Sequence, residues 1–341
     1  MSVLHLNLSS GGYDIYLERG ALDRAGELFR LDRKVLIVTD DGVPAQYAAR
    51  VASQCREAHV VTVPSGEGSK SFHGLELLCR ALLEHGFTRS DCAVAVGGGV
   101  VGDLTGFAAS TYMRGIDFYN VPTTLLSQVD SSIGGKTAIN LCGVKNIIGA
   151  FYQPRAVLID PEVLKTLPKR QISAGLAEAV KMSLTSDAEL FDIFERGEAE
   201  ERIDTVIERS LMIKRHVVEQ DERETGLRRV LNFGHTLGHG IEGEAELHGL
   251  YHGECVALGM LPMCAPSVRE RLVRVLESLS LPTRIEGDLD RMLDIASHDK
   301  KCEGKDISVV YVEEVGSFSI LKMPTEEWKA GVRETLRGGL I

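Results

Sequence analysis

Four short apolar runs, separated by segments of helical composition, most constrain the fold of the first half of this chain. They cover residues 34–39, 59–63, 92–96 and 156–159. Strands that are apolar on both faces are typical of a parallel sheet, because helices cover both faces of such a sheet. Residues 44–57 and 75–84 are predicted helices. We therefore expect an α/β domain with a parallel Rossmann-like sheet over residues 1–165.

The pattern changes after about residue 168. Long segments with helical periodicity follow, at residues 174–185, 200–220, 232–246, 254–264 and 266–279. One β-hairpin is expected near the end, from residues 308–312 and 317–321 around Gly316. Residues 166–341 are therefore predicted to form a mainly α-helical, metal-binding domain. The cleft between the two domains is the expected site.

Charge and composition exclude several functional classes. The formal net charge of -11 opposes binding to nucleic acid, which needs basic residues to neutralise phosphates. No run of 18 apolar residues predicts a membrane span, and the N-terminus lacks the pattern of a signal peptide. The seven cysteines include no CxxC pair and are interpreted as reduced thiols. A cytoplasmic enzyme acting on a small molecule is the resulting expectation.

A glycine-rich turn, Gly97-Gly-Gly-Val-Val-Gly102, follows the predicted strand 92–96 and precedes a predicted helix over residues 103–113. Glycines at such a turn let the backbone approach a pyrophosphate, and the helix N-terminus attracts its charge. An ordinary tight turn is the alternative. The motif does not follow the first strand and no acidic residue lies at the usual distance beyond it, so Asp40 could hold a ribose instead. We predict nucleotide binding with a modified layout.

Cations and an amide gather on a second glycine-rich stretch. Asp130-Ser-Ser-Ile-Gly-Gly-Lys136 and Lys145-Asn146 lie close in sequence, and Arg114 follows the predicted helix 103–113. In an acidic protein, these groups together indicate a site for an anion. Solvated surface charges are the alternative for any one of them taken alone.

Histidines are concentrated near residue 240. The segment Asn232-Phe-Gly-His235-Thr-Leu-Gly-His239-Gly-Ile-Glu242 places two imidazoles four residues apart, on one face of a helix. Four of the ten histidines, at positions 235, 239, 248 and 252, fall within eighteen residues. Two imidazoles and a carboxylate are a common catalytic zinc site. The spacing does not select the histidines that bind, or one carboxylate among Glu178, Glu242 and Glu254.

Many motifs, in order over essentially the whole chain, resemble those of the 3-dehydroquinate synthase family. They include Gly97-Gly-Gly-Val-Val-Gly-Asp103, Tyr112-Met-Arg-Gly115, Gln128-Val-Asp-Ser-Ser-Ile-Gly-Gly-Lys136, Ala177-Glu-Ala-Val-Lys181, Leu231-Asn-Phe-Gly-His-Thr-Leu-Gly-His239 and His252-Gly-Glu254. The family converts 3-deoxy-arabino-heptulosonate 7-phosphate to 3-dehydroquinate and phosphate. The resemblance implies an NAD cofactor, a zinc or cobalt ion and a small phosphorylated sugar acid as substrate.

The resemblance also implies roles for individual residues. The NAD site would comprise Asp40, Glu67, Lys70, Gly98, Gly99, Val100, Asp103, Thr123, Thr124 and Lys145. Zinc would be held by Glu178, His235 and His252, with His239 beside the substrate. The ring hydroxyls would contact Asp130, Lys181, Lys214 and Asn232. Arg228 would face the substrate carboxylate, and the phosphate would be held by Lys136, Asn146 and either Lys300 or Lys301. Arg114 would reach the phosphate site of the partner in a homodimer.

The implied chemistry uses NAD without consuming it. Oxidation at carbon 5 acidifies the proton on carbon 6, phosphate leaves by elimination, the hydride returns, and ring opening with an aldol step gives the product. Two positions depart from the family pattern. Asn140-Leu-Cys-Gly-Val-Lys145 lacks a histidine that many members carry after the asparagine, and Gly42 replaces a frequent asparagine. Both departures are expected to affect affinity more than chemistry.

Three alternatives remain from the sequence. One is another sugar phosphate cyclase, although Lys214, Asn232 and a lysine near position 300 favour the dehydroquinate branch. A second is a metal-dependent oxidoreductase related to glycerol dehydrogenases, which the 130–136 loop and the Glu178–Lys181 pair argue against. The third is an inactive homologue that serves as a binding subunit, which the intact candidate residues disfavour.

Overall fold

The computed structural model describes residues 1–245, 249–297, 302–303 and 306–337. The chain divides into two compact units, Met1–Pro168 and Lys169–Ile341. Over the described residues, we find no helix that is both long and apolar enough to span a membrane.

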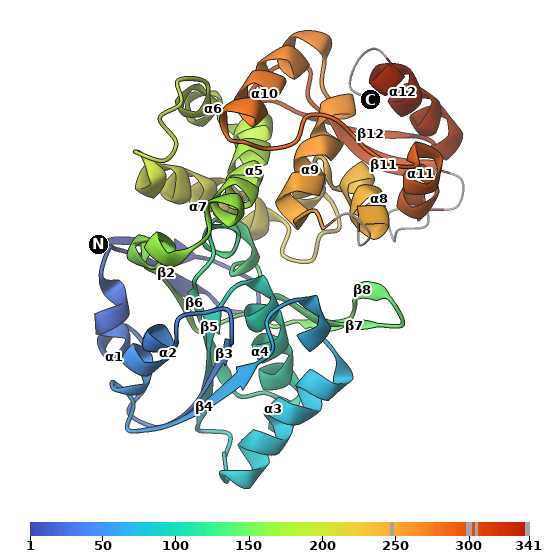
Figure 1. The fold of residues 1–341 in the computed structure, drawn as a ribbon. Coiled ribbons are helices and arrows are strands. Elements are labelled where there is room, and N and C mark those ends of the chain that lie inside the picture. The colour runs from blue at the N-terminus through green and yellow to red at the C-terminus, as the bar shows by residue number, and fades with distance from the viewer. Residues whose placement is uncertain (246–248, 298–301, 304–305, 338–341) are drawn as a thin grey trace. The chain divides into compact units, whose positions relative to one another are not determined.

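A seven-stranded sheet forms the centre of the first unit, all of whose residues are described (Figure 1). Its order is β1-β2-β9-β6-β5-β3-β4, and only the edge pair β1–β2 is antiparallel. The strands are β1 (Ser2–Leu6), β2 (Tyr13–Leu17), β3 (Lys34–Asp40), β4 (Glu57–Val63), β5 (Cys92–Gly97), β6 (Asp117–Pro122) and β9 (Ala156–Ile159). The predicted Rossmann-like parallel sheet is thus confirmed, and three of its strands, β1, β2 and β6, were not predicted.

Strand β3 shows why the central strands are apolar throughout. Val35 and Ile37 pack into one apolar cluster, whereas Leu36 and Val38 pack into another on the opposite face. The first cluster includes residues of α1 (Ala25–Leu28) and α2 (Ala45–Ala52), and the second includes residues of α3 (Phe72–Glu84) and α4 (Gly99–Thr111). Because helices cover both faces of the sheet, every residue in the middle of the strand is buried in one cluster or the other.

Two helix predictions in this unit were wrong at their ends. The helix expected over residues 44–57 is only α2, because the chain turns after Ala52 and begins β4 at Glu57. The helix expected from residue 103 begins at Gly99, so part of the glycine-rich segment is helical. Gly102 N donates to Gly98 O at 3.0 Å, which closes the first turn of α4. Tertiary packing has overridden the low helix propensity of glycine there.

An antiparallel hairpin projects from the first unit (Figure 1). It is formed by β7 (Lys136–Leu141) and β8 (Val144–Phe151), with an irregular register between Ile139 and Leu141. The hairpin was not predicted as strands. It carries Lys136, Lys145 and Asn146, three of the candidate anion-binding residues.

Helices dominate the second unit. They include α5 (Lys169–Ser186), α6 (Ala188–Glu195), α7 (Ile203–Gln220), α8 (His235–Ala245), α9 (His252–Met260), α10 (Pro266–Ser278), α11 (Leu289–Ser297) and α12 (Thr325–Arg337). The described residues also form a small antiparallel sheet of β10 (Cys302–Glu303), β11 (Asp306–Tyr311) and β12 (Ser319–Pro324). The predicted hairpin is confirmed as β11 and β12, which pair Val309 with Leu321.

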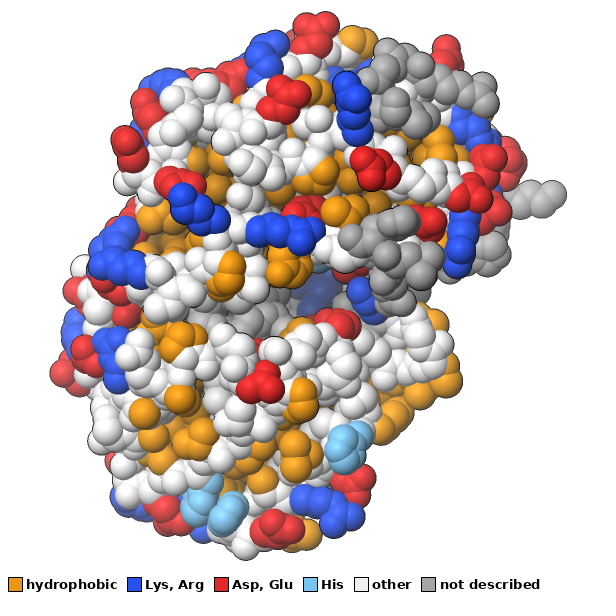
Figure 2. All heavy atoms as spheres, in the orientation of Figure 1, with side chains coloured by type: hydrophobic (Ala, Val, Ile, Leu, Met, Phe, Trp, Pro, Cys, Tyr) orange, Lys and Arg blue, Asp and Glu red, His pale blue; other side chains and the backbone are white. Residues whose placement is uncertain are grey.

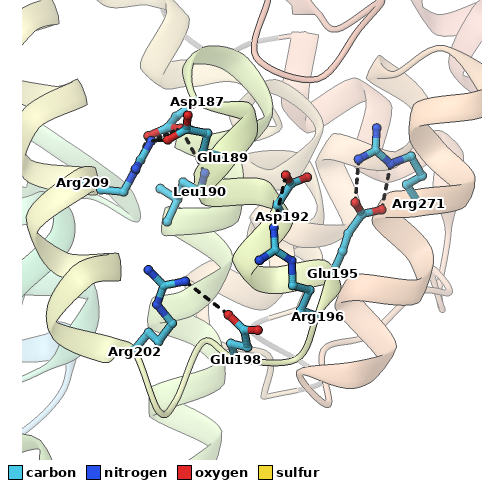
Figure 3. A network of polar contacts seen from close by, with 10 residues as sticks. All are labelled: Asp187, Glu189, Leu190, Asp192, Glu195, Arg196, Glu198, Arg202, Arg209 and Arg271. Atoms are coloured by element: carbon cyan, nitrogen blue, oxygen red, sulfur yellow. Dashed lines mark hydrogen bonds and ion pairs between the residues drawn. The ribbon is translucent and has the colours of Figure 1, made fainter.

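Arginine–carboxylate pairs join α6 to its neighbours (Figure 3). Arg209 of α7 contacts both oxygens of Asp187 at 2.7 Å, and Asp187 also accepts from Leu190 N at 3.0 Å to cap α6. Arg271 of α10 makes a similar pair with Glu195, at 2.6 and 2.7 Å. Such forked pairs fix geometry as well as adding energy. They hold α6, α7 and α10 in register around the helical core.

Charges of both signs are interspersed on the face of the molecule shown in Figure 2. Lysine and arginine side chains lie among aspartate and glutamate side chains, and hydrophobic side chains form several small groups. This face therefore carries mixed charge instead of one broad field of a single sign.

Candidate active site

Three helices of the second unit bring Glu178, His235 and His252 together. Their ligand atoms all lie within 4.8 Å of one another. His235 Nε2 is 3.6 Å and His252 Nε2 is 3.5 Å from Glu178 Oε1. Two imidazoles and one carboxylate leave room in the coordination shell for a substrate or water, which is typical of a catalytic divalent metal. The group can therefore hold such an ion.

Close helix packing makes this convergence possible. A Cβ atom on Gly253 would lie 1.9 Å from the backbone oxygen of Ala174 in α5. A Cβ atom on Gly259 would lie 2.0 Å from the backbone oxygen of Gly234, just before α8. Glycine at both positions lets α9 approach the two helices that carry the other candidate ligands.

Glu178 is fully buried, as is its neighbour Lys181 on α5. Lys181 Nζ lies 2.5 Å from Glu178 Oε2 and also donates to Leu231 O at 2.8 Å. Burial by itself raises the pKa of Glu178, but the Lys181 charge and His252 outweigh it and hold that pKa below its ordinary value. Despite the ion pair, neither Glu178 oxygen accepts a well-formed hydrogen bond from the described residues. A buried carboxylate with lone pairs to spare suits a metal ion.

The second ring nitrogen of each histidine faces an acceptor. His235 Nδ1 is 3.2 Å from Phe233 O, and His252 Nδ1 is 3.3 Å from Glu242 Oε2. Burial lowers the pKa of His252, but its contacts with Glu178 and Glu242 outweigh that effect and raise the pKa to about 10. The two carboxylates therefore create a negative potential at His252 that favours a cation there.

The other candidates for the ligand set are not members of this group. Glu242 contacts His252 from outside the group, and His248 falls outside the described residues. Glu254 is occupied elsewhere, since Arg170 contacts its two oxygens at 2.7 and 2.8 Å and Tyr251 N donates to it at 2.7 Å. His239 is near, with its ring centroid 5.6 Å from that of His235. It is nevertheless not a member of the group whose ligand atoms meet within 4.8 Å.

A short loop and the 3₁₀ segment η6 (Leu227–Asn232) hold further candidates. Asp221 accepts backbone hydrogen bonds from Thr225, Gly226 and Arg228 at 2.7 to 2.9 Å. Burial raises the pKa of Asp221, but these donors outweigh burial and lower it to about 2. The anionic Asp221 thus fixes the backbone that carries Arg228.

The side chains on this loop are also held in place. Arg228 Nη1 donates to Glu222 O at 2.5 Å and its side chain is buried. Asn232 Nδ2 donates to Glu224 Oε1 at 2.6 Å. Lys214 is buried on α7, which packs against η6. The structure therefore places Arg228, Asn232 and Lys214 in one neighbourhood of the second unit, to which Lys181 is linked through Leu231.

Three cofactor candidates, Glu67, Lys70 and Asp103, form a polar cluster with the phosphate candidate Asn146 at α4 and the β7–β8 hairpin. Lys70 Nζ is 2.7 Å from Asp103 Oδ2, 2.5 Å from Asn146 Oδ1 and 3.4 Å from Glu67 Oε1. Asn140 was not among the predicted site residues. Its Nδ2 donates to Glu67 Oε1 at 2.9 Å, and its Oδ1 accepts from Asn146 N at 2.8 Å. Its place at the start of the segment Asn140–Lys145, which departs from the family pattern, was the available signal.

The start of α4 lies at the carboxyl end of β5. Thr124 lies 3.0 Å from where a Cβ on Gly98 would be, and Thr123 N donates to Gly97 O at 2.9 Å. Asp40, at the end of β3, accepts from Gly42 N at 2.9 Å, and burial raises the pKa of Asp40. The carboxyl edge of a parallel sheet beside a helix N-terminus is where nucleotides bind in this class of fold.

The remaining candidates are more dispersed. Arg114 is exposed in the 3₁₀ turn η3 (Tyr112–Arg114) after α4, with φ of 67°. Lys136 is exposed at the start of β7, Lys145 lies near the tip of the hairpin, and Asp130 lies in the helical segment η4 (Ser127–Ser131). Lys300 and Lys301 fall outside the described residues.

Comparisons with known proteins agree over nearly the whole chain. A model described as 3-dehydroquinate synthase N-terminal matches residues 60–174, and one described as 3-dehydroquinate synthase C-terminal matches residues 175–302. A 3-dehydroquinate synthase of Enterococcus faecalis is 43% identical over 96% of this chain and 97% of that protein. One from Streptococcus suis is 42% identical over 95% of this chain and 98% of that protein.

Solved structures give the same result for the fold. A 2-deoxy-scyllo-inosose synthase in complex with carbaglucose-6-phosphate, NAD+ and Co2+ is 25% identical, with a TM-score of 0.88 over 98% of this chain and 100% of that chain. A 2-epi-5-epi-valiolone synthase from Streptomyces hygroscopicus with NAD+ and Zn2+ is 27% identical, with a TM-score of 0.86 over 99% of each chain. A probable glycerol dehydrogenase from Sinorhizobium meliloti is 18% identical with a TM-score of 0.61 over 94% of this chain and 95% of that one, and so shares the fold alone.

Proposed function

This chain belongs to the 3-dehydroquinate synthase family and shares its activity, and from that premise we propose how its residues support the reaction. The substrate is 3-deoxy-D-arabino-heptulosonate 7-phosphate, and the products are 3-dehydroquinate and phosphate. The reaction uses one NAD and one divalent ion, zinc or cobalt. The observation that carries the proposal is the convergence of Glu178, His235 and His252 from three helices.

The residues of this group fit a divalent ion. Glu178 stays anionic although buried, and each imidazole presents Nε2 toward Glu178 Oε1. When bound, the metal ion would supply Lewis-acid polarisation of two neighbouring substrate oxygens, and NAD would supply a reversible hydride acceptor. His239, near the group but outside it, would lie beside the substrate, where an imidazole can take up or release a proton.

Residues of the second unit would bind and orient the sugar acid. Arg228 suits the substrate carboxylate, because a guanidinium donates paired hydrogen bonds to two oxygens. The ring hydroxyls would be bound by Lys181, Lys214 and Asn232, with Asp130 of the first unit. Because Lys181 is already held by Glu178 and Leu231 O, its ammonium would need little reorganisation to act.

Residues of the first unit would bind NAD and the substrate phosphate. The NAD site would comprise Asp40, Glu67, Lys70, Gly98, Gly99, Val100, Asp103, Thr123, Thr124 and Lys145. The N-terminus of α4 supports this assignment because its free N–H groups attract a pyrophosphate. Lys136 and Asn146 would hold the substrate phosphate, together with either Lys300 or Lys301. Arg114 would complete that site from the partner in a homodimer.

The free thiols support a reducing, cytoplasmic location as part of this proposal. Free cysteines among the described residues are Cys55, Cys79, Cys92, Cys142, Cys255 and Cys264. Disulfides are rare in the cytosol, where thiols are kept reduced.

One incubation tests the proposed reaction. The purified protein is mixed with the heptulosonate phosphate, NAD and zinc, and phosphate, 3-dehydroquinate and NADH are followed together. We expect phosphate and 3-dehydroquinate to appear in equal amounts without accumulation of NADH, because the hydride returns to the substrate. The Glu178→Gln variant is the control for metal-dependent turnover. A rise of NADH in step with product would instead identify a net oxidoreductase of the glycerol dehydrogenase type.

A further inference from the structure

His252 lies between two carboxylates. Its Nε2 faces Glu178 Oε1 at 3.5 Å, and its Nδ1 faces Glu242 Oε2 at 3.3 Å. The two ring nitrogens of an imidazole point in divergent directions, so Glu178 and Glu242 contact different edges of the ring. Glu178 belongs to the ligand group, whereas Glu242 does not.

Helix α8 carries both His235, a member of the ligand group, and Glu242, which contacts His252 from outside that group. His235, His239 and Glu242 are separated by four and three residues, so they follow one face of the helix. Helices α8 and α9 pack closely along their length. Glu242, near the end of α8, can therefore reach Nδ1 of His252 at the start of α9. His235, at the start of α8, reaches the ligand group itself.

The outer ring nitrogen of His235 also faces a hydrogen-bond acceptor, in this case a backbone carbonyl. Its Nδ1 faces Phe233 O at 3.2 Å. A backbone carbonyl only accepts, so the neutral imidazole of His235 carries its hydrogen on Nδ1 and its lone pair on Nε2. An ionised carboxylate also only accepts, and Glu242 would impose the same tautomer on His252. With a metal ion bound beside Glu178, both imidazoles would then direct the Nε2 lone pair at that ion.

We infer that Glu242 is a positioning residue whose carboxylate accepts the Nδ1–H of His252 and fixes the ring with Nε2 directed at the bound metal ion. The inference rests on the proposed function, because the ligand set is itself part of that proposal. An outer carboxylate of this kind fixes the tautomer and makes the ligand more basic. Removing it is expected to weaken metal affinity by about 10- to 100-fold.

Zinc affinity of the full chain, without substrate or NAD, tests this role. Glu242→Ala and Glu242→Gln are titrated against a competing chromophoric chelator. We expect weaker binding for Glu242→Ala by about 10- to 100-fold. Glu242→Gln should fall in between, because its amide oxygen still accepts but carries no charge. Glu326→Ala, which removes an exposed glutamate from the first turn of α12, is the charge-matched control and should bind zinc like the wild type.

The cobalt-substituted protein supplies a readout that a purely structural role would not change. Its visible spectrum reports the geometry around the ion, and we expect it to differ between Glu242→Ala and the wild type while the metal-free proteins unfold at similar temperatures. If Glu242→Ala does not fold, the zinc affinity and the cobalt spectrum of the similarly sized Glu242→Gln variant test the inference instead. Wild-type affinity and an unchanged cobalt spectrum in the folded variants would overturn the inference.

The His252→Ala variant separates this inference from the proposed function. If His252→Ala loses zinc while the Glu242 variants bind normally, the ligand set stands and only the positioning role fails. If His252→Ala binds zinc as tightly as the wild type, the ligand set itself is wrong, and the role of Glu242 fails with it.

Discussion

Gly253 passes the backbone of Ala174 so closely that a Cβ atom on Gly253 would lie 1.9 Å from the Ala174 oxygen. Gly253 directly follows His252 on α9, and Ala174 lies one helical turn before Glu178 on α5. The contact therefore sets the distance between the two elements that supply a carboxylate and an imidazole to the candidate metal site.

Gly253→Ala is expected to separate α5 from α9. The backbone oxygen of Ala174 cannot move without distorting its helix, so the added methyl group should cost about 1–3 kcal/mol of unfolding free energy. Zinc binding should weaken as well, because His252 moves away from Glu178. Urea unfolding and a zinc titration measure the two effects. Gly331→Ala in α12, where nothing lies within 4 Å of the added Cβ, is the control and should be neutral or slightly stabilising. Equal behaviour of the two variants would contradict the packing argument.

The ligand set predicts different outcomes for three neighbouring histidines. His235→Ala and His252→Ala should each lose bound zinc and activity, since each removes one of three donors. His239→Ala should retain zinc but turn over more slowly, because the His239 ring lies outside the ligand group and is proposed to lie beside the substrate. Metal analysis of the purified variants, followed by turnover with added zinc, distinguishes them. A zinc-free His239→Ala variant would show that the ligand assignment is wrong.

Lys70 is expected to stabilise the first unit at a constant level across neutral pH. Burial lowers the pKa of Lys70, but Asp103 and Glu67 outweigh burial and raise that pKa above its ordinary value. A raised pKa means that the stabilisation is complete below the unfolded-state value and is lost only as pH rises through the folded-state value. Lys70→Met should cost about 1–3 kcal/mol, because it leaves two partly buried carboxylates without their cation. This cost should stay constant from about pH 6 to about pH 9.

Urea unfolding at several pH values measures the cost of Lys70→Met. Lys165→Met is the matched control, because Lys165 pairs with Glu162 in an exposed position. Its effect should be within about 0.5 kcal/mol of the wild type. A difference between Lys70→Met and the wild type that vanishes near neutral pH would mean that the Lys70 cluster does not stabilise the fold.

The sequence predicts best those features that depend on local pattern. The apolar run that became β5 is buried at every position, and the four-residue spacing placed His235 and His239 on one face of α8. Features that depend on contacts between distant segments were not predicted from the pattern. Glu178 meets His252 only because α5 packs against α9. The resemblance to a family, not the spacing, selected Glu178.

Two of the structural misses, the β7–β8 hairpin and the early start of α4, had no clear periodic signal. The β7–β8 hairpin is largely exposed along β8, so its strands lack the apolar alternation that identifies a half-buried strand. The early start of α4 places glycines inside a helix, against their intrinsic preference. Spacing also puts Glu242 on the same face as His235, so sequence alone cannot distinguish an inner ligand from an outer acceptor.

Arg114 lies at the far end of α4 from the glycine-rich turn. The helix runs from Gly99 to Thr111, which at 1.5 Å per residue separates its ends by about 20 Å. An exposed guanidinium at that distance would not serve the cofactor phosphates near the helix start. We therefore predict a homodimer in which Arg114 completes the phosphate site of the partner. Arg114→Ala should weaken substrate binding and leave NAD and zinc binding close to normal.

Complementation between two damaged subunits decides this prediction. Arg114→Ala and Lys136→Ala are each expected to be nearly inactive. In a hybrid dimer, the site in the Arg114→Ala subunit keeps its own Lys136 and receives an intact Arg114 from the other chain. Random exchange of subunits makes about half of the dimers hybrids, and each hybrid has one intact site out of two. Activity should therefore return to about a quarter of the wild-type value. Mixing Lys136→Ala with Arg228→Ala, two residues assigned to the same chain's site, should restore nothing. If native mass spectrometry shows hybrids and the Arg114 mixture stays inactive, Arg114 acts within its own subunit and the shared site is wrong.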